Sequence, residues 1–299
     1  MSDTPIVPCI WLDHQAEEAA RFYTTLLPGG RITAVSRYPD TMDNPGGKPR
    51  GSVLTVEFEV AGQRMTALNG GAQFRPNPSV SMLLELESVA EVDRVFAALA
   101  EGGEVRMPLG EYPWSPRFGW VSDRYGLSWQ VMLGGAEAPK VVATLLFVGA
   151  QRGRAAEALA LYAEVFEGAR VEGVEYFGDG ACPDRLVKHA RLAVGAQTLA
   201  LMDGPGEHAF AFNEGVSLQV MCADQGTVDR YWRALSEGGA EGPCGWLKDR
   251  FGVSWQVVPV QMVEWLASED HAARNRAFVA VMDMTKLDLA AIEAAYRGG

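Results

Sequence analysis

The sequence has few of the residues that bind metals or form disulfides. Among its 299 residues are four cysteines and four histidines. The cysteines show no Cys-x-x-Cys spacing, and the histidines share no metal-ligand spacing. Scattered cysteines of this kind are typical of reduced thiols, so we expect a cytoplasmic protein without a disulfide framework.

Long apolar runs and positive charge are also scarce. The longest strongly apolar stretch, residues 141–150, is much shorter than the roughly 20 residues that cross a membrane. The first residues lack a basic region followed by an apolar one, and so predict no signal peptide. A net charge of −12 repels phosphate backbones and anionic lipids. We therefore expect neither a nucleic acid nor a membrane as partner.

Glycine-rich nucleotide-binding motifs are missing. The sequence has no Gly-x-Gly-x-x-Gly, no Gly-x-Ser-x-Gly and no P-loop, since Gly46-Gly47-Lys48 is followed by proline. Doubly wound folds bind nucleotides at a glycine-rich turn between a strand and a helix. The sequence therefore argues against a nucleotide or S-adenosylmethionine site of that type.

A long internal repeat organises the chain. Residues 122–133 return at 248–259 with seven of twelve positions identical, and both copies have an Asp-x-x-Gly turn and a Ser-Trp-Gln-Val run. A period of this length is that of a small domain rather than of a solenoid repeat. We therefore predict a tandem duplication, with a first domain over 1–135, a second over 136–260 and a helical tail over 261–299.

The hydrophobic pattern of each copy predicts one strand, one helix and three strands, and then the same order again. Ser88 and Glu91 form a capping box for the second helix of the first copy. The middle strands are predicted near 31–38, 52–60 and 63–69, and near 170–177, 186–194 and 197–203. The predicted fold class is α+β, with two domains that are each built of paired βαβββ modules. Each domain should form an open, cleft-forming sheet with helices on its outer face.

This order resembles that of a known superfamily. An Asp-x-x-Gly turn precedes the last strand of each copy, and Phe22 and Tyr23 form a Phe-Tyr pair in the first helix. With these features the sequence resembles the vicinal-oxygen-chelate superfamily of glyoxalases, bleomycin-resistance proteins and ring-cleaving dioxygenases. Segments 8–13, 67–71 and 244–249 are similar to its PhnB-like branch, often labelled 3-demethylubiquinone-9 3-methyltransferase. The resemblance covers nearly the whole chain and implies two tandem glyoxalase-like domains.

The resemblance also implies where a metal would bind. Metal-using members take one ligand from the first strand, two from middle strands, and a glutamate four residues after the Asp-x-x-Gly glycine. Neutral residues hold these positions here: Pro8, Met65 or Ala67, Ser81 and Gln130 in the first copy, and Thr144, Leu199 or Leu201, Ser217 and Gln256 in the second. Divalent ions need carboxylate or imidazole ligands. We therefore predict that the metal site is lost and that no cofactor is bound.

A ligand site is predicted in the cleft of the first copy, against Gln130. Residues 112–118 are rich in aromatic side chains, are stiffened by two prolines and have no counterpart in the second copy. They form either a loop that closes over this cleft or a plain surface excursion. The candidate ligand-binding residues are Trp11, His14, Asn69, Phe74, Trp114, Phe118 and Gln130. Weaker equivalents in the second copy are His189, Asp203, Phe210 and Gln256.

Several candidates also have a structural interpretation. Asn69 and Asp203 occupy matching positions after a strand, which is typical of turn residues. His14 could cap a helix or face solvent, and Gln130 could be satisfied by the backbone. The tryptophans that precede Gln130 and Gln256 are expected in the core, because burial of large aromatic side chains is strongly favourable.

These observations lead to one functional hypothesis and one alternative. The hypothesis is a metal-independent protein that binds a small apolar or aromatic molecule in the cleft of the first domain. The alternative is an enzyme of the same superfamily: a metal-dependent lyase, isomerase or dioxygenase-like enzyme, or the methyltransferase that the family label suggests. The duplication predicts a pseudo-dimer within one chain and leaves a homodimer open.

Overall fold

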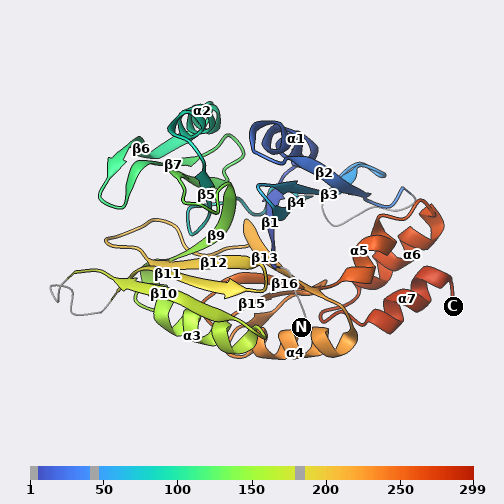
Figure 1. Cartoon of the computed structure of the whole chain (residues 1–299). Helices are drawn as coiled ribbons and strands as arrows, with labels where there is room; N and C mark the ends of the chain where they lie inside the picture. The colour runs from blue at the N-terminus through green and yellow to red at the C-terminus, as the bar shows by residue number, and fades with distance from the viewer. Residues whose placement is uncertain (1–5, 41–46, 179–185) are drawn as a thin grey trace.

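The computed structural model describes residues 6–40, 47–178 and 186–299, and their strands form two eight-stranded sheets (Figure 1). The strand order of sheet A is β14 (Ala240–Glu241), β15 (Trp246–Lys248), β16 (Ser254–Pro259), β13 (Val216–Cys222), β1 (Ile6–Leu12), β4 (Gln63–Asn69), β3 (Val53–Val60), β2 (Arg31–Arg37). The strand order of sheet B is β10 (Arg170–Tyr176), β11 (Val187–Val194), β12 (Gln197–Asp203), β9 (Lys140–Phe147), β5 (Val80–Leu86), β8 (Ser128–Leu133), β7 (Ser115–Ser122), β6 (Glu104–Tyr112). All of the predicted middle strands are present, and each observed strand end lies within one residue of the predicted end.

Each sheet combines one module of the first repeat with one module of the second. Sheet A joins β1–β4 to β13–β16 through an antiparallel pair of β1 and β13. Sheet B joins β5–β8 to β9–β12 through an antiparallel pair of β5 and β9. The two repeats therefore form a pseudo-dimer within one chain. The cleft of either sheet is built by both repeats, which corrects the expectation of a cleft formed by the first repeat alone.

Four helices cover the outer faces of the sheets (Figure 1). The first repeat supplies α1 (Ala16–Leu26) and α2 (Val89–Ala100), and the second supplies α3 (Ala155–Val165) and α4 (Gln225–Ser236). Each helix buries an apolar face; in α2 this face is Val92, Val95, Phe96 and Leu99. The serine half of the predicted capping box is present, since the Ser88 hydroxyl accepts a hydrogen bond from the Glu91 backbone at 3.3 Å.

The repeated Asp-x-x-Gly turn is held by its aspartate. In the first repeat, Asp123 Oδ1 accepts hydrogen bonds from the backbone of Tyr125 and Leu127 at 2.8 and 3.1 Å. Its Oδ2 accepts one from Trp129 Nε1 at 2.9 Å. Gly126 has a φ of 85°, which a glycine adopts without strain. Trp129 is fully buried, as expected, so the repeated motif is a folding device.

Residues 112–118 differ from the loop that the sequence predicted. They form the end of a hairpin in which β6 pairs with β7, and Tyr112 lies opposite Ser115. Tyr112, Trp114 and Phe118 pack against one another, with ring centroids 5.1–5.6 Å apart. The two prolines are compatible with the hairpin, because Pro113 lies in its turn and Pro116 is the second residue of β7.

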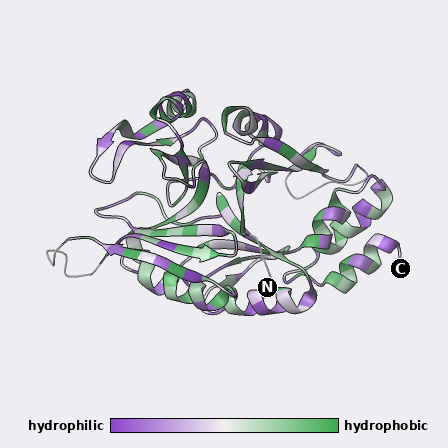
Figure 2. Cartoon of the chain, in the orientation of Figure 1, coloured by the Kyte–Doolittle hydropathy of each residue, from purple (hydrophilic) through white to green (hydrophobic). Residues whose placement is uncertain are grey.

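The tail forms three helices: α5 (Val260–Leu266), α6 (His271–Met282) and α7 (Leu289–Arg297). Apolar and polar residues are mixed along them (Figure 2). Their apolar residues pack on the inner face of sheet A at Val7, Met221 and Val258. The tail therefore closes one side of the cleft of sheet A. No helix among the described residues is both long and apolar enough to cross a membrane.

Candidate functional site

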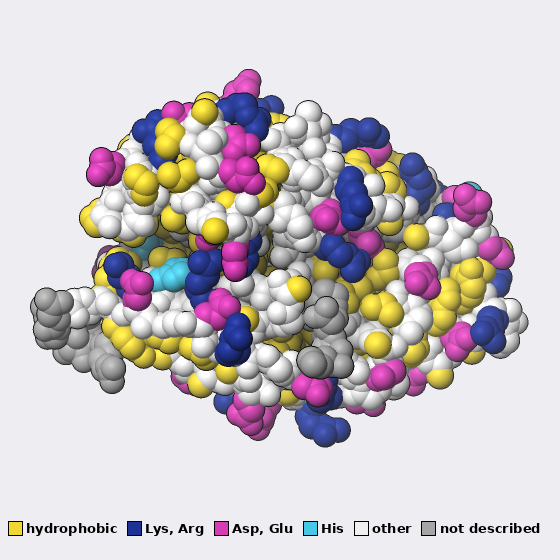
Figure 3. Space-filling view, in the orientation of Figure 1, with side chains coloured by type: hydrophobic (Ala, Val, Ile, Leu, Met, Phe, Trp, Pro, Cys, Tyr) yellow, Lys and Arg dark blue, Asp and Glu magenta, His cyan; other side chains and the backbone are white. Residues whose placement is uncertain are grey.

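The cleft of sheet A encloses a cavity of about 600 Å³. Strands of both repeats line it, and the tail contributes Met262, Leu266 and Phe278. Apolar side chains gather between the upper strands and the tail helices in Figure 3. A side cavity of about 110 Å³ shares Gln219, Gln256 and Met262 with the main one. The volume of the main cavity is within the usual range for small-molecule sites.

An aromatic wall forms one side of the main cavity. Trp11 on β1 makes edge contacts with Phe74 at 5.0 Å and with Trp246 at 5.7 Å between ring centroids. Edge-to-face contacts of this kind stabilise the cluster beyond the area that it buries. Trp11 and Phe74 belong to the first repeat and Trp246 to the second, so this wall exists only where the two repeats meet in sheet A.

The segment Asn69-Gly70-Gly71 fixes the position of Trp11. Its indole Nε1 donates a hydrogen bond to the Gly71 carbonyl at 2.8 Å. A Cβ atom on Gly70 would lie 2.3 Å from the indole ring, so a glycine is required for the ring to pack there. In the sequence this segment was noted for its similarity to the PhnB-like branch. The contacts with Trp11 explain why it contains glycines.

Asn69 has a structural role beside this site. Its Oδ1 accepts a hydrogen bond from the Ala16 backbone at the start of α1 (2.9 Å), and its Nδ2 donates to the Val53 carbonyl (3.0 Å). Asp203 does the same in the second repeat, where it accepts from the backbone of Gly153 and Val187. Both residues satisfy buried backbone groups instead of lining the cavity.

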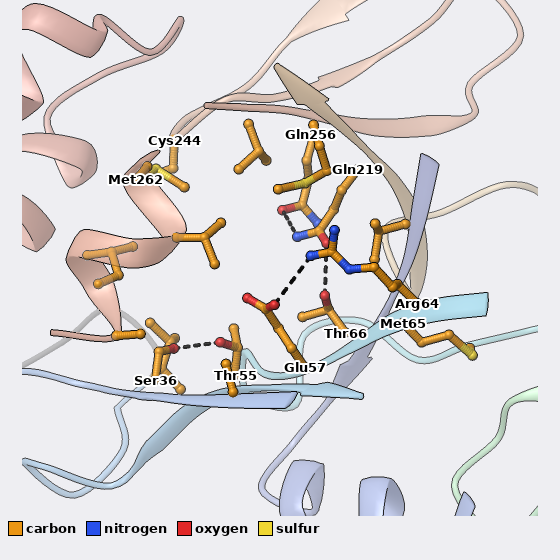
Figure 4. A pocket seen from close by; sticks show the side chains of 18 residues that line it. Ser36, Thr55, Glu57, Arg64, Met65, Thr66, Gln219, Cys244, Gln256 and Met262 are labelled. Carbon is orange, nitrogen blue, oxygen red and sulfur yellow. Dashed lines mark hydrogen bonds and ion pairs between the residues drawn. The ribbon is translucent and has the colours of Figure 1, made fainter. Parts of the chain in front are cut away.

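A chain of hydrogen bonds crosses the floor of the cleft of sheet A, and Figure 4 shows its part between Thr66 and Gln256. The Thr66 hydroxyl donates to Gln219 Oε1 at 2.9 Å, and Gln219 Nε2 donates to Gln256 Oε1 at 3.2 Å. Gln256 Nε2 then donates to the Ser217 hydroxyl at 2.8 Å. Gln219 uses one of its two N–H groups in this chain, so its other N–H can be offered to a ligand.

The thiol of Cys9 lies beside this chain. The side chain is buried, and burial raises the pKa of its thiol to about 12, although hydrogen bonds with Gln256 and Ser217 oppose the shift. The thiolate, which is the reactive form, is therefore scarce near neutral pH.

One ion pair faces the side cavity. Arg64 Nη2 lies 3.6 Å from Glu57 Oε2, and both side chains point into the space between sheet A and α5 (Figure 4). Burial raises the pKa of Glu57, and Arg64 offsets part of this shift. At the rim of the main cavity, Lys248 pairs with Glu214 at 2.9 Å.

The residues at the inferred metal positions do not suit a divalent ion. The cleft-facing residue of β1 is Cys9 rather than Pro8, and that of β4 is Thr66, which lies between Met65 and Ala67. With Gln256 these are a protonated thiol, a hydroxyl and an amide, whereas divalent ions need charged or imidazole ligands. No group of three or more His, Cys, Asp or Glu side chains gathers among the described residues.

The equivalent cleft of sheet B has a different floor. Gln130 again donates to a serine, Ser81, at 2.9 Å. Leu83 and Ala200 occupy the positions of Gln219 and Thr66, and they belong to a small apolar cluster. The continuous hydrogen-bond chain of sheet A therefore has no equivalent here.

The predicted ligand residues do not form one site. Trp11, Phe74 and Gln256 come together in the cavity of sheet A. Trp114, Phe118, Gln130 and His189 belong to sheet B, where Trp114 is 48% exposed. His14 is exposed and lies 3.3 Å from Asp13, and Phe210 contacts His208 in the segment between β12 and β13.

Other lining residues were missed in the sequence. Trp246 lies inside a segment noted only for its family resemblance, and Glu57 is not among the candidate residues predicted from the sequence. Its alternation with the apolar residues Val56 and Phe58 is the signal that places it on the cleft face. The tail residues gave no comparable signal.

The chain matches one family model in both repeats. The model, described as 3-demethylubiquinone-9 3-methyltransferase, matches residues 4–132 and 139–258. The chain belongs to this family. The two matches confirm the tandem duplication, and each falls within one predicted repeat. No curated protein matches the sequence.

Solved structures of similar proteins fall into two groups. A PhnB protein from Bacillus cereus is 34% identical, and the match covers 43% of this chain and 98% of that protein, with a TM-score of 0.39. Protein PA1353 from Pseudomonas aeruginosa is 30% identical over 44% of this chain and 97% of its own, with a TM-score of 0.37. Glyoxalase I from Zea mays is 13% identical over 90% of this chain and 96% of its own, with a TM-score of 0.55. The last likeness confirms the predicted two-domain glyoxalase-like α+β fold.

Proposed function

We propose that this protein binds a small, largely apolar aromatic compound in the cleft of sheet A, without a metal ion. The observation that carries the proposal is the cavity of about 600 Å³ between the aromatic wall and the tail. Binding sites of this kind combine apolar walls with a few polar groups that orient the ligand. Here the spare N–H group of Gln219 supplies that polar contact. The site therefore differs from the one expected against Gln130.

The differences between the two clefts support this choice. The two clefts are built from copies of the same module. Among the described residues, however, the hydrogen-bond chain crosses only the cleft of sheet A, and the tail packs only on that sheet. The neutral donor set beside Cys9 supports binding without a metal. The family name mentions a demethylubiquinone, and its flat, conjugated quinone ring would suit a wall formed by Trp11 and Trp246.

A titration with the neutral fluorescent dye N-phenyl-1-naphthylamine tests the proposal. Protein treated with a chelator should bind the dye at a stoichiometry of one, and Trp11→Ala should weaken binding by about tenfold because a ring contact is lost. Trp114→Ala is the matched control, since it removes an exposed tryptophan from sheet B. The proposal fails if dye binding requires added metal, or if Trp114→Ala is the damaging variant.

The family name favours a second candidate, a methyltransferase. This function requires a site for a methyl donor in addition to the aromatic acceptor. Calorimetry with S-adenosylmethionine separates the two candidates, because a binding protein without methyl transfer should give no heat. Saturable binding of S-adenosylmethionine would favour the methyltransferase.

A further inference from the structure

The side cavity extends the proposed ligand site toward two charged residues. Its volume of about 110 Å³ leaves room for a small polar group, since one water molecule occupies about 30 Å³ in the liquid. Gln219, Gln256 and Met262 border both cavities, so a ligand that lies against Trp11 can reach into the side cavity. What this space can bind is decided by the groups that line it.

A row of cleft-facing residues leads to Glu57. Ser217, Cys9, Thr66 and Glu57 are paired in turn across the adjacent strands β13, β1, β4 and β3. Neighbouring strands are about 4.8 Å apart, so this row runs across the whole floor of the cleft. The first three members are neutral, and the carboxylate of Glu57 is the charged end of the row.

Glu57 and Arg64 retain capacity for a further hydrogen bond. The closest approach of their charged atoms, 3.6 Å, is longer than a hydrogen bond. Among the described residues that line the side cavity, these two are the charged ones. A carboxylate accepts and a guanidinium donates, so the pair offers one group of each kind to the same small space.

The chemistry of the pair selects its ligand group. A cationic group would be repelled by Arg64, and an anionic group would be repelled by Glu57. A hydroxyl group is neutral, donates to the carboxylate and accepts from the guanidinium. We propose that Glu57 and Arg64 form a subsite for a hydroxyl group on the aromatic ligand, so that the ligand class is a phenol. This inference rests on the proposed function, since the ring must occupy the main cavity.

The second cleft again serves as an internal comparison. The strand register places Arg191 at the position of Glu57 and Thr198 at the position of Arg64. Arg191 forms an ion pair at 3.0 Å with Glu85 on β5. The arrangement in sheet A is therefore not a general requirement of the duplicated module.

Calorimetric titrations with three naphthalenes test this subsite. The probes are 2-naphthol, 2-methoxynaphthalene and 2-naphthoate, which share a ring and differ in one substituent. The hydroxyl should make 2-naphthol bind about tenfold more tightly than the other two, since hydrogen bonds to charged groups are strong. Glu57→Gln should reduce this preference to about twofold or less, while 2-methoxynaphthalene binds as before. Glu59→Gln is the control, because Glu59 lies on the same strand and pairs with Arg31 instead.

The outcomes separate the subsite from the proposed function. If none of the three probes binds, the proposed aromatic site is overturned together with the subsite. If all three bind equally, or if Glu57→Gln leaves the preference for 2-naphthol intact, the subsite is overturned and the aromatic site stands. Tighter binding of 2-naphthoate would also overturn the subsite, because Arg64 would then act alone.

Discussion

The Tyr23 hydroxyl donates a hydrogen bond of 2.7 Å to Asp123, a residue 100 positions away in the chain. Tyr23 lies on α1, which packs on sheet A, whereas Asp123 lies in the turn between β7 and β8 of sheet B. The second repeat has the same contact, from Tyr162 to Asp249 at 2.6 Å. Each repeat therefore fastens the two sheets together with a buried tyrosine–aspartate pair.

Replacing Asp123 by asparagine should destabilise the protein strongly. The amide group would place a donor against Trp129 Nε1, which is itself a donor, and this buried mismatch should cost about 2–4 kcal/mol. Chemical denaturation measures the loss. Asp93→Asn is the control, since Asp93 forms a half-exposed ion pair with Arg117 and should cost less than about 1 kcal/mol. Equal losses in the two variants would contradict the role assigned to Asp123.

The same aspartate predicts a pH dependence of stability. Burial raises the pKa of Asp123 from 3.8 to about 6, although four hydrogen-bond donors oppose the shift. Between these values the folded protein binds the proton more tightly than the unfolded chain does. The contribution of this group to stability should therefore rise as the pH falls from 7 to 4, by about 2 kcal/mol.

The comparison with Asp123→Asn isolates this contribution, because asparagine does not titrate in this range. The difference in unfolding free energy between the native protein and the variant should grow toward pH 4. A difference that stays constant, or shrinks, would show that Asp123 is ionised in the folded protein throughout.

The two equivalent glutamines should differ in their effect on binding. Gln256→Ala removes the acceptor of Gln219 and the donor to Ser217, so N-phenyl-1-naphthylamine should bind about fivefold more weakly. Gln130→Ala changes the cleft of sheet B and should leave the affinity unchanged. The reverse result would place the ligand against Gln130, where the sequence had first suggested it.

The tail should matter for both binding and stability. Phe278 on α6 lines the main cavity and makes an edge contact with Tyr38 at 6.1 Å. Phe278→Ala should lower the free energy of unfolding by about 3 kcal/mol and weaken dye binding. The exposed neighbour Val279 provides the control, and its change to alanine should cost less than about 0.5 kcal/mol. Undiminished dye affinity in Phe278→Ala would remove the tail from the site.

The sequence predicted local structure better than pairing. Alternation along β3 and β4, and the helix cap at Ser88, depend on neighbours in the chain and were recognised correctly. The sequence did not predict that β1 pairs with β13. Because the modules are copies of one another, β1 presents a similar edge to β5 and to β13, and only packing over the whole molecule decides between them.

The same reason explains which site residues were found. Trp11, Phe74 and Gln256 could be identified by residue type and motif, but not as neighbours. They come together because each sheet pairs a module of the first repeat with a module of the second. Glu57 and the tail residues line the site only because modules of the two repeats pair in sheet A. Their sequence patterns are those of an ordinary strand face and ordinary helices.

A crystal structure of the protein soaked with 6-bromo-2-naphthol tests the central claim most directly. We expect one anomalous bromine peak in the cavity of sheet A, with the ring against Trp11 and the hydroxyl directed toward Glu57. A bromine peak in the cleft of sheet B beside Gln130, with the cavity of sheet A empty, would contradict it.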